Sequence, residues 1–157
     1  TTKAHGKVEV RVMSAIPLNT VAEPFIRLRS IHHLDKKYIV IFAGGIGNPY
    51  VTTDYTAAQR AIETRSDALL FAKNKARGIF TDDPKTNPAA QLYRRMHYNT
   101  IIQNNLTIVD QSSILLARDH QLPIHVFDFD ETGTMEKICN GEDLGTLVSN
   151  VEQDVLE

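Results

Sequence analysis

The fold class of this 157-residue chain is decided by the stretch Tyr38-Ile39-Val40-Ile41-Phe42-Ala43-Gly44-Gly45. Its first six residues form a continuous apolar run, and two glycines end that run. Continuous rather than alternating hydrophobicity predicts a strand that is buried on both faces, as in a parallel sheet. A second run of this kind occupies residues 67–73. The sequence therefore predicts a parallel sheet with at least two buried strands.

Outward from this stretch, expected strands alternate with expected helices. We predict strands at 8–13, 38–43, 67–73, 123–129 and 145–148, and helices at 20–34, 54–65, 98–104, 110–120 and 133–139. The helix at 20–34 is expected to begin with a capping box formed by Thr20 and Glu23. This alternation predicts an α/β fold, a three-layer sandwich with a largely parallel central sheet. We expect one domain over 1–157, with an acidic, frayed tail at 149–157.

Composition and charge exclude several classes of partner. Apolar residues make up 42% and charged residues 23% of the chain, with a formal net charge of −2. Without a basic excess we expect no nucleic-acid partner, and without an apolar run of roughly 20 residues we expect no membrane span. Residues 1–6 lack the apolar stretch of a secretory signal. The single Cys139 cannot form an internal disulfide, so we expect a cytoplasmic protein with this cysteine in its core.

The first loop of unusual composition is Gly44-Gly45-Ile46-Gly47-Asn48-Pro49-Tyr50-Val51-Thr52-Thr53-Asp54. Its glycines let the backbone approach a ligand and turn N–H groups outward, and its threonines precede a helix whose N-terminus favours an anion. These features indicate a phosphate or nucleotide cradle. The alternative is a glycine-rich turn with Asp54 as the helix N-cap. The spacing matches neither the Walker loop nor the Rossmann fingerprint.

The second loop follows the strand that ends at Lys73 and runs Asn74-Lys75-Ala76-Arg77-Gly78-Ile79-Phe80-Thr81-Asp82-Asp83-Pro84. An aromatic ring beside a carboxylate and an amide could hold a purine. A surface turn shaped by its last three residues is the alternative. Ligands of open α/β sheets bind at the carboxyl ends of strands, where both loops are expected to lie.

Other charged residues have ordinary structural interpretations. Asp110 opens a helix, so N-capping explains it, although a charge role near a nucleotide is the alternative. Arg94 and Arg95 are interpreted as part of a solvated helix face, although they could contact a phosphate.

Residues 42–54 resemble the hallmark loop of bacterial uridylate kinases, which belong to the amino-acid-kinase fold family. The similarity continues at 12–17, 72–74, 78–84, 115–119, 122–124 and 141–148. It therefore extends over nearly the whole chain, from about Val8 to Val148. Several motifs in the family's order make this resemblance more specific than a single glycine loop would be.

The resemblance implies residue roles. A UMP site would be formed by Gly45, Ile46, Gly47, Asn48, Pro49, Tyr50, Val51, Thr52 and Thr53. The adenosine end of ATP would be held by Asn74, Phe80 and Asp83. Asp54 and Asp110 resemble the carboxylates that the family places near the phosphates, as catalytic residues. The implied reaction is ATP + UMP → ADP + UDP, with Mg²⁺ bound to ATP and no residue assigned as a metal ligand. A homohexamer, GTP activation and UTP inhibition are also implied.

Three features depart from the family pattern. The family's lysine-bearing phosphate loop has no counterpart in the sequence, so we expect an amino-terminal portion of the fold to precede Thr1. Arg77 stands where the family usually has Asp, which reverses a charge beside the ATP loop. Ile46 replaces a usual threonine and removes one hydroxyl donor. Two alternatives to a UMP kinase remain: a nucleotide-binding or storage module without catalysis, and another phosphotransferase of the same fold.

Overall fold

The computed structural model describes residues 8–18 and 20–157. The expectation for residues 1–6 falls outside the described residues. The strands are β1 (Val10–Ser14), β2 (Glu23–Pro24), β3 (Ile39–Ala43), β4 (Leu69–Lys73), β5 (Tyr93–His97), β6 (Ile124–Asp128), β7 (Thr146–Ser149) and β8 (Val155–Leu156). The helices are α1 (Arg27–Asp35), α2 (Thr53–Glu63), α3 (Tyr98–Gln103), α4 (Gln111–Asp119) and α5 (Thr134–Cys139).

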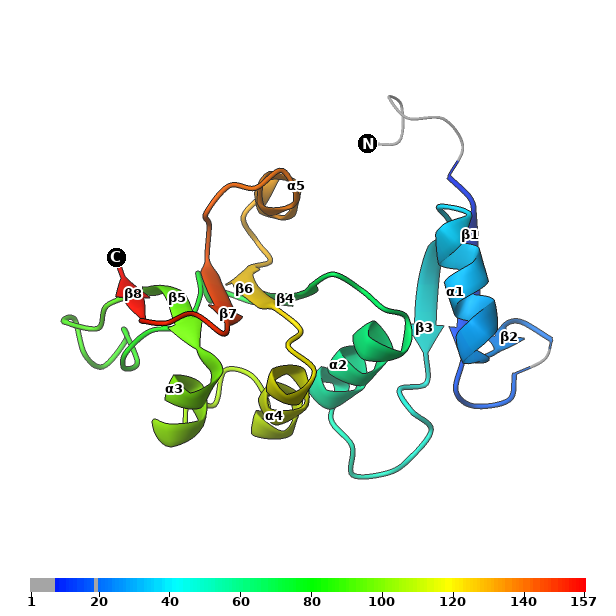
Figure 1. Ribbon diagram of the computed structural model, residues 1–157, viewed down its shortest axis with the longest axis horizontal. Helices are drawn as coiled ribbons and strands as arrows, with labels where there is room; N and C mark the ends of the chain where they lie inside the picture. Colours follow the sequence, from blue (N-terminus) through cyan, green and yellow to red (C-terminus); the bar gives the residue numbers. More distant parts are fainter. Residues whose placement is uncertain (1–7, 19) are drawn as a thin grey trace.

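The strands form two sheets. One has the order β2-β1-β3 and is wholly parallel, and the other has the order β4-β6-β7-β5-β8. In the second sheet β4 pairs with β6 and β5 with β7 in parallel, whereas β6 and β7 run antiparallel. Figure 1 shows α5 on one face of the five-stranded sheet and α3 and α4 on the other. The predicted α/β fold with a largely parallel sheet is confirmed.

The buried core lies around the five-stranded sheet. Ile124, Val126 and Val148 are fully buried, and they pack with apolar residues of α3 and α4. The three-stranded sheet contrasts with this, because Ile39 is 54% and Ile41 is 50% exposed. The prediction that 38–43 is buried on both faces is therefore wrong for this strand. One face of β3 is open, although the apolar sequence of the strand is suited to burial.

The expected helix at 20–34 begins later than predicted. Glu23 and Pro24 form β2, which pairs in parallel with the end of β1, and α1 starts only at Arg27. Proline lacks the N–H of a helix interior and disfavours helical geometry in the residue before it. The capping box of Thr20 and Glu23 is therefore not formed, and Glu23 instead lies 3.2 Å from the ring of His33.

Strands β5 and β8 were not predicted from the sequence. Arg94 and Arg95 lie in β5, not on a helix face. The tail is paired rather than frayed: β8 runs antiparallel to β5, and Asp154 accepts hydrogen bonds from the His97 N–H at 2.7 Å and the Thr100 hydroxyl at 2.7 Å. Because each strand supplies part of the other's hydrogen bonding, neither shows a strong pattern by itself.

Two smaller expectations can also be compared with the structure. Cys139 is exposed at the end of α5, so its predicted place in the core is wrong. Within residues 8–18 and 20–157, no helix combines the length and the apolarity that a membrane crossing requires.

Candidate active site

The loop between β3 and α2 is an open turn whose backbone depends on glycine. Gly44, Gly45 and Gly47 have φ angles of 75°, 62° and 80°, in the left-handed region that glycine enters without steric cost. A hydrogen bond of 3.0 Å from the Gly47 N–H to the Gly44 carbonyl closes the turn. Tyr50 also has a positive φ, of 62°, and its side chain is fully exposed. The loop therefore presents main chain and an aromatic ring to solvent rather than packing shut.

Thr52, not Asp54, is the N-cap of α2. Its hydroxyl accepts a hydrogen bond from the Tyr55 N–H at 3.2 Å. This leaves the carboxylate of Asp54, in the first turn, free to bond elsewhere. A carboxylate in the first turn also interacts favourably with the helix dipole.

Arg60, on α2, holds the glycine loop in place through a hydrogen bond. The Arg60 side chain is buried, and it donates a hydrogen bond of 3.0 Å to the Gly45 carbonyl. The same guanidinium lies 3.6 Å from the ring centroid of Phe25 and pairs with Glu63. The two terminal nitrogens of Arg60 are hydrogen-bonded, whereas its buried Nε has no hydrogen-bond partner, and the bond to Gly45 fixes the loop against α2. The sequence showed no local signal for this role.

The loop after β4 lines a cavity of about 830 Å³. Its walls include the three residues assigned to adenosine, namely Asn74, Phe80 and Asp83. The cavity is also lined by residues 104–108, which lead into α4 and were not predicted to take part. A cavity of this size, with an aromatic ring and a few amide and carboxylate groups, is suited to a nucleoside-sized ligand.

Asp83 has a structural role in the same loop. Its carboxylate accepts a hydrogen bond of 2.9 Å from the Lys85 N–H, and its carbonyl accepts one from the Asn87 N–H. The turn expected from 82–84 is therefore present, and it forms part of the cavity wall. The structural and the ligand-binding interpretations of Asp83 are compatible.

The two loops meet at a single carboxylate, that of Asp54. Lys73 Nζ, at the end of β4, donates hydrogen bonds of 3.0 Å and 2.8 Å to its two oxygens. The backbone N–H of Asp110 donates to one of the same oxygens at 3.2 Å, and the Ser113 hydroxyl donates to the Asp54 carbonyl. The starts of α2 and α4 and the end of β4 are thus joined at the carboxylate of Asp54.

Asp110 is the N-cap of α4, as its position predicted. Its carboxylate accepts a hydrogen bond of 2.8 Å from the Ser112 N–H and another of 2.8 Å with the Ser112 hydroxyl. The pKa of Asp110 is lowered, first by a hydrogen bond with the Thr52 side chain and then by those with Ser112. Asp110 is therefore ionised at neutral pH.

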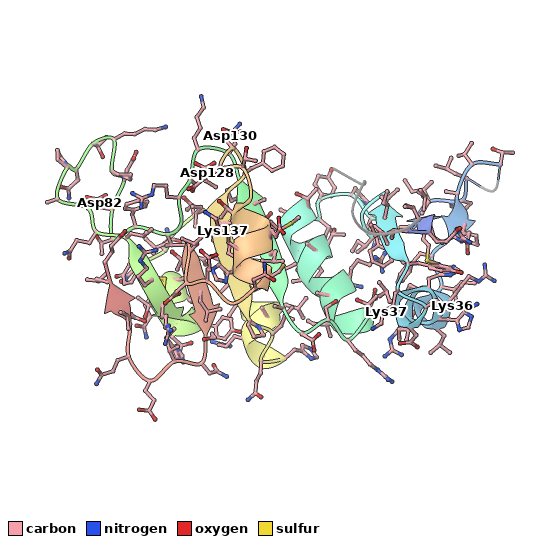
Figure 2. All side chains as sticks on the ribbon, turned by 90° about the horizontal axis from the view of Figure 1, so that it is seen from above. Lys36, Lys37, Asp82, Asp128, Asp130 and Lys137 are labelled. Carbon is pink, nitrogen blue, oxygen red and sulfur yellow. The ribbon has the colours of Figure 1, made fainter. Side chains whose placement is uncertain are left out.

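Charged side chains of both signs lie near the end of β6. Figure 2 shows Asp128 and Asp130 close to Lys137, with Asp82 farther along and Lys36 and Lys37 at the opposite end of the molecule. Asp128 ends β6 and pairs in register with Lys73 of β4. No group of three or more His, Cys, Asp or Glu side chains within the described part of the chain is arranged to hold a metal ion.

The predicted residues fall into three groups. Asp54 and Asp110 are joined directly, and the three adenosine residues share one cavity. Residues 45–51 form the exposed loop and line none of the described cavities. Lys73 and Arg60 were missed because their partners lie 19 and 15 residues away in sequence. Only topology brings such pairs together.

Fold and site define the class of this protein: an α/β protein with its candidate ligand site at the carboxyl ends of parallel strands. Residues 7–128 match the model of the amino acid kinase family. The chain belongs to that family.

Curated relatives and solved structures extend the comparison. The chain is 47% identical over 147 residues to a uridylate kinase of Frankia casuarinae, covering 94% of the chain and 57% of the relative. It is 43% identical to a uridylate kinase of Streptococcus thermophilus, covering 91% and 58%. The structure of a UMP kinase from Bacillus anthracis superposes with a TM-score of 0.93 at 55% identity, covering 96% of this chain and 61% of that one. The chain thus spans less than two thirds of the length of these relatives.

Proposed function

We propose that the protein carrying this chain transfers the γ-phosphoryl group of ATP to UMP, giving ADP and UDP for pyrimidine nucleotide synthesis. The observation that carries the proposal is the junction at Asp54, where the glycine loop meets the loop that lines the adenosine-sized cavity. Phosphoryl transfer needs two nucleotides aligned end to end, and two adjoining loops suit that need. The curated relatives are named uridylate kinases, which agrees with UMP as the phosphoryl acceptor.

The site residues have separate tasks in this proposal. Gly45 to Thr53 would hold UMP through main-chain N–H groups and threonine hydroxyls. The cavity would hold adenosine, with Phe80 against the base and the polar groups of Asn74 and Asp83 at its edge. Asp54 and Asp110 would lie between them, beside the phosphates.

Magnesium would arrive with ATP. Mg²⁺ favours one or two carboxylates together with phosphate oxygens and water, and an ionised Asp110 fits that donor set. The bound ion would neutralise charge on the phosphates. Asp54 is less suited as a ligand, because both of its oxygens already accept hydrogen bonds.

An assay of ADP release tests the reaction. The full-length protein would be incubated with MgATP and, in separate reactions, with UMP, CMP or acetylglutamate. We expect turnover with UMP well above that with CMP and none with acetylglutamate. Turnover without a UMP preference would instead support another phosphotransferase of the same fold.

A nucleotide-binding module without catalysis is the second candidate for this chain. A titration of the 157-residue chain with UMP and with ATP, beside a turnover assay, separates the two. Binding without turnover in both the chain and the full-length protein would establish the module.

Assembly and regulation belong to the same proposal. The family resemblance supports a cytoplasmic homohexamer that is activated by GTP and inhibited by UTP. Light scattering of the full-length protein, together with rates measured with and without each effector, tests these points.

A further inference from the structure

Lys73 occupies the boundary between the two loops. It is the last residue of β4, and Asn74, the first residue of the cavity wall, follows it directly. Its partner Asp54 comes directly after the glycine loop. The Lys73 side chain is 25% and that of Asp54 20% exposed, so the pair is shielded but still reaches solvent. The ammonium group therefore lies where the two loops meet.

Among the described residues, Lys73 Nζ lies 5.1 Å from the centroid of the Phe71 ring, and several acidic residues lie close to it in the fold. Asp54 bonds to it, Asp110 contacts Asp54 through its backbone, and Asp128 lies opposite on β6. The carboxylates of Asp54 and Asp110, whose helix starts are joined here, would repel a polyphosphate unless a cation offsets them. A phosphoryl group in transfer spreads negative charge over its equatorial oxygens and is stabilised by cations fixed in advance. Lys73 supplies such a fixed cation beside Asp54.

Asp54 is better suited to hold Lys73 than to act as a base. Both carboxylate oxygens face the lysine ammonium at hydrogen-bond distance. The attacking oxygen in the proposed reaction belongs to a phosphate, whose second pKa near 6 leaves it ionised at neutral pH. No proton needs to be removed from it.

We infer that Lys73 is a catalytic residue that donates hydrogen bonds to the transferring phosphoryl group, with Asp54 as its positioning residue. The inference rests on the proposed function. In the step, the bond from the γ-phosphorus to the ADP oxygen breaks as the bond to the UMP phosphate oxygen forms. The ammonium group remains protonated throughout and moves from Asp54 toward the equatorial oxygens.

Substitution of Lys73 in the full-length protein tests this. Lys73→Met removes the charge and keeps the length of the side chain, so we expect kcat to fall about 10²- to 10³-fold, with the KM of both nucleotides changed far less. Lys73→Arg retains a cation and should recover at least a tenth of the wild-type kcat. Lys137→Met removes the same charge on exposed α5 and serves as the matched control, with unchanged rates.

A second measurement distinguishes direct contact between Lys73 and the phosphoryl group from a purely structural role of Lys73. Sulfur in place of a γ-phosphoryl oxygen weakens a hydrogen bond from lysine, so ATPγS should slow the wild-type enzyme more than it slows Lys73→Met. An equal thio effect in both enzymes, or a Lys73→Met enzyme with wild-type kcat, would overturn the inference. A wild-type enzyme that makes no UDP would instead overturn the proposed function.

Discussion

Asp110 combines a structural and an electrostatic task in one carboxylate, and substitution can separate them. Asp110→Ala removes the N-cap of α4 and should lower the free energy of unfolding by about 1 kcal/mol at pH 7. Asp110→Asn keeps a capping oxygen and should be much closer to wild type in stability. Urea unfolding of the three proteins measures both effects. Equal losses in the two variants would show that the charge, not the cap, stabilises the helix.

The pH dependence of the same variants follows from the lowered pKa. A carboxyl group whose pKa is lower in the folded than in the unfolded state stabilises the protein above its ordinary value of 3.8. That contribution is lost as the pH falls through the folded-state pKa. The stability difference between wild type and Asp110→Ala should therefore shrink as urea unfolding is repeated from pH 7 toward pH 3. A difference that stays constant would contradict the lowered pKa.

Thr53 offers a test of the glycine loop at the level of a single hydroxyl. It is the first residue of α2 and its side chain is exposed. Thr53→Ala should weaken UMP binding by about 1–3 kcal/mol, the worth of one hydrogen bond to a charged group, and leave ATP binding unchanged. Calorimetric titration with each nucleotide measures this. Unaltered UMP affinity would remove Thr53 from the proposed site.

At the level of elements, the glycine that precedes β7 is more constrained than the one that precedes α5. A Cβ on Gly145 would lie 2.3 Å from the Val126 carbonyl oxygen, and its φ is 72°. A Cβ on Gly133, with a φ of 85°, would meet nothing within 4 Å. Gly133→Ala should therefore cost only the left-handed backbone strain, about 1–2 kcal/mol.

Gly145→Ala should cost clearly more than its control, because strain and a backbone clash add and β6 and β7 must separate. Thermal unfolding of both variants gives the comparison. Similar melting temperatures for the two variants would contradict this prediction. They would show that β6 and β7 can move apart at Gly145 with little loss of stability.

Local pattern predicted most elements of this chain and failed where an element depends on a distant partner. Apolar runs located β3, β4 and β6 to within two residues at each end. The strand with Arg94 and Arg95 was missed because its charges are paired with Glu157 and Asp143, far along the chain. Pro24 outweighed a capping pattern and delayed α1. In the site, composition found both loops, but the contacts of Lys73 and Arg60 depend on topology.

At the scale of the whole molecule, burial is uneven. Apolar side chains of β1 and β3 are about half exposed on one face, whereas β6 and β7 lie in the core. In hydrogen-exchange measurements on the 157-residue chain, we expect the amides of 124–128 to exchange more slowly than those of 10–14 and 39–43. The reason is that opening the buried strand costs more free energy. Equal protection would mean that both sheets unfold as one cooperative unit.

The bond between Lys73 and Asp54 has a thermodynamic consequence. If a phosphate draws the ammonium group away, the carboxylate at the start of α2 loses its partner. The conformation of the glycine loop, which directly precedes α2, then changes. The free energy of filling one loop then depends on whether the other is filled, and such linkage acts equally in both directions. ATP would thus alter the dissociation constant of UMP by the same factor by which UMP alters that of ATP, and neutralising Asp54 would bring that factor toward one.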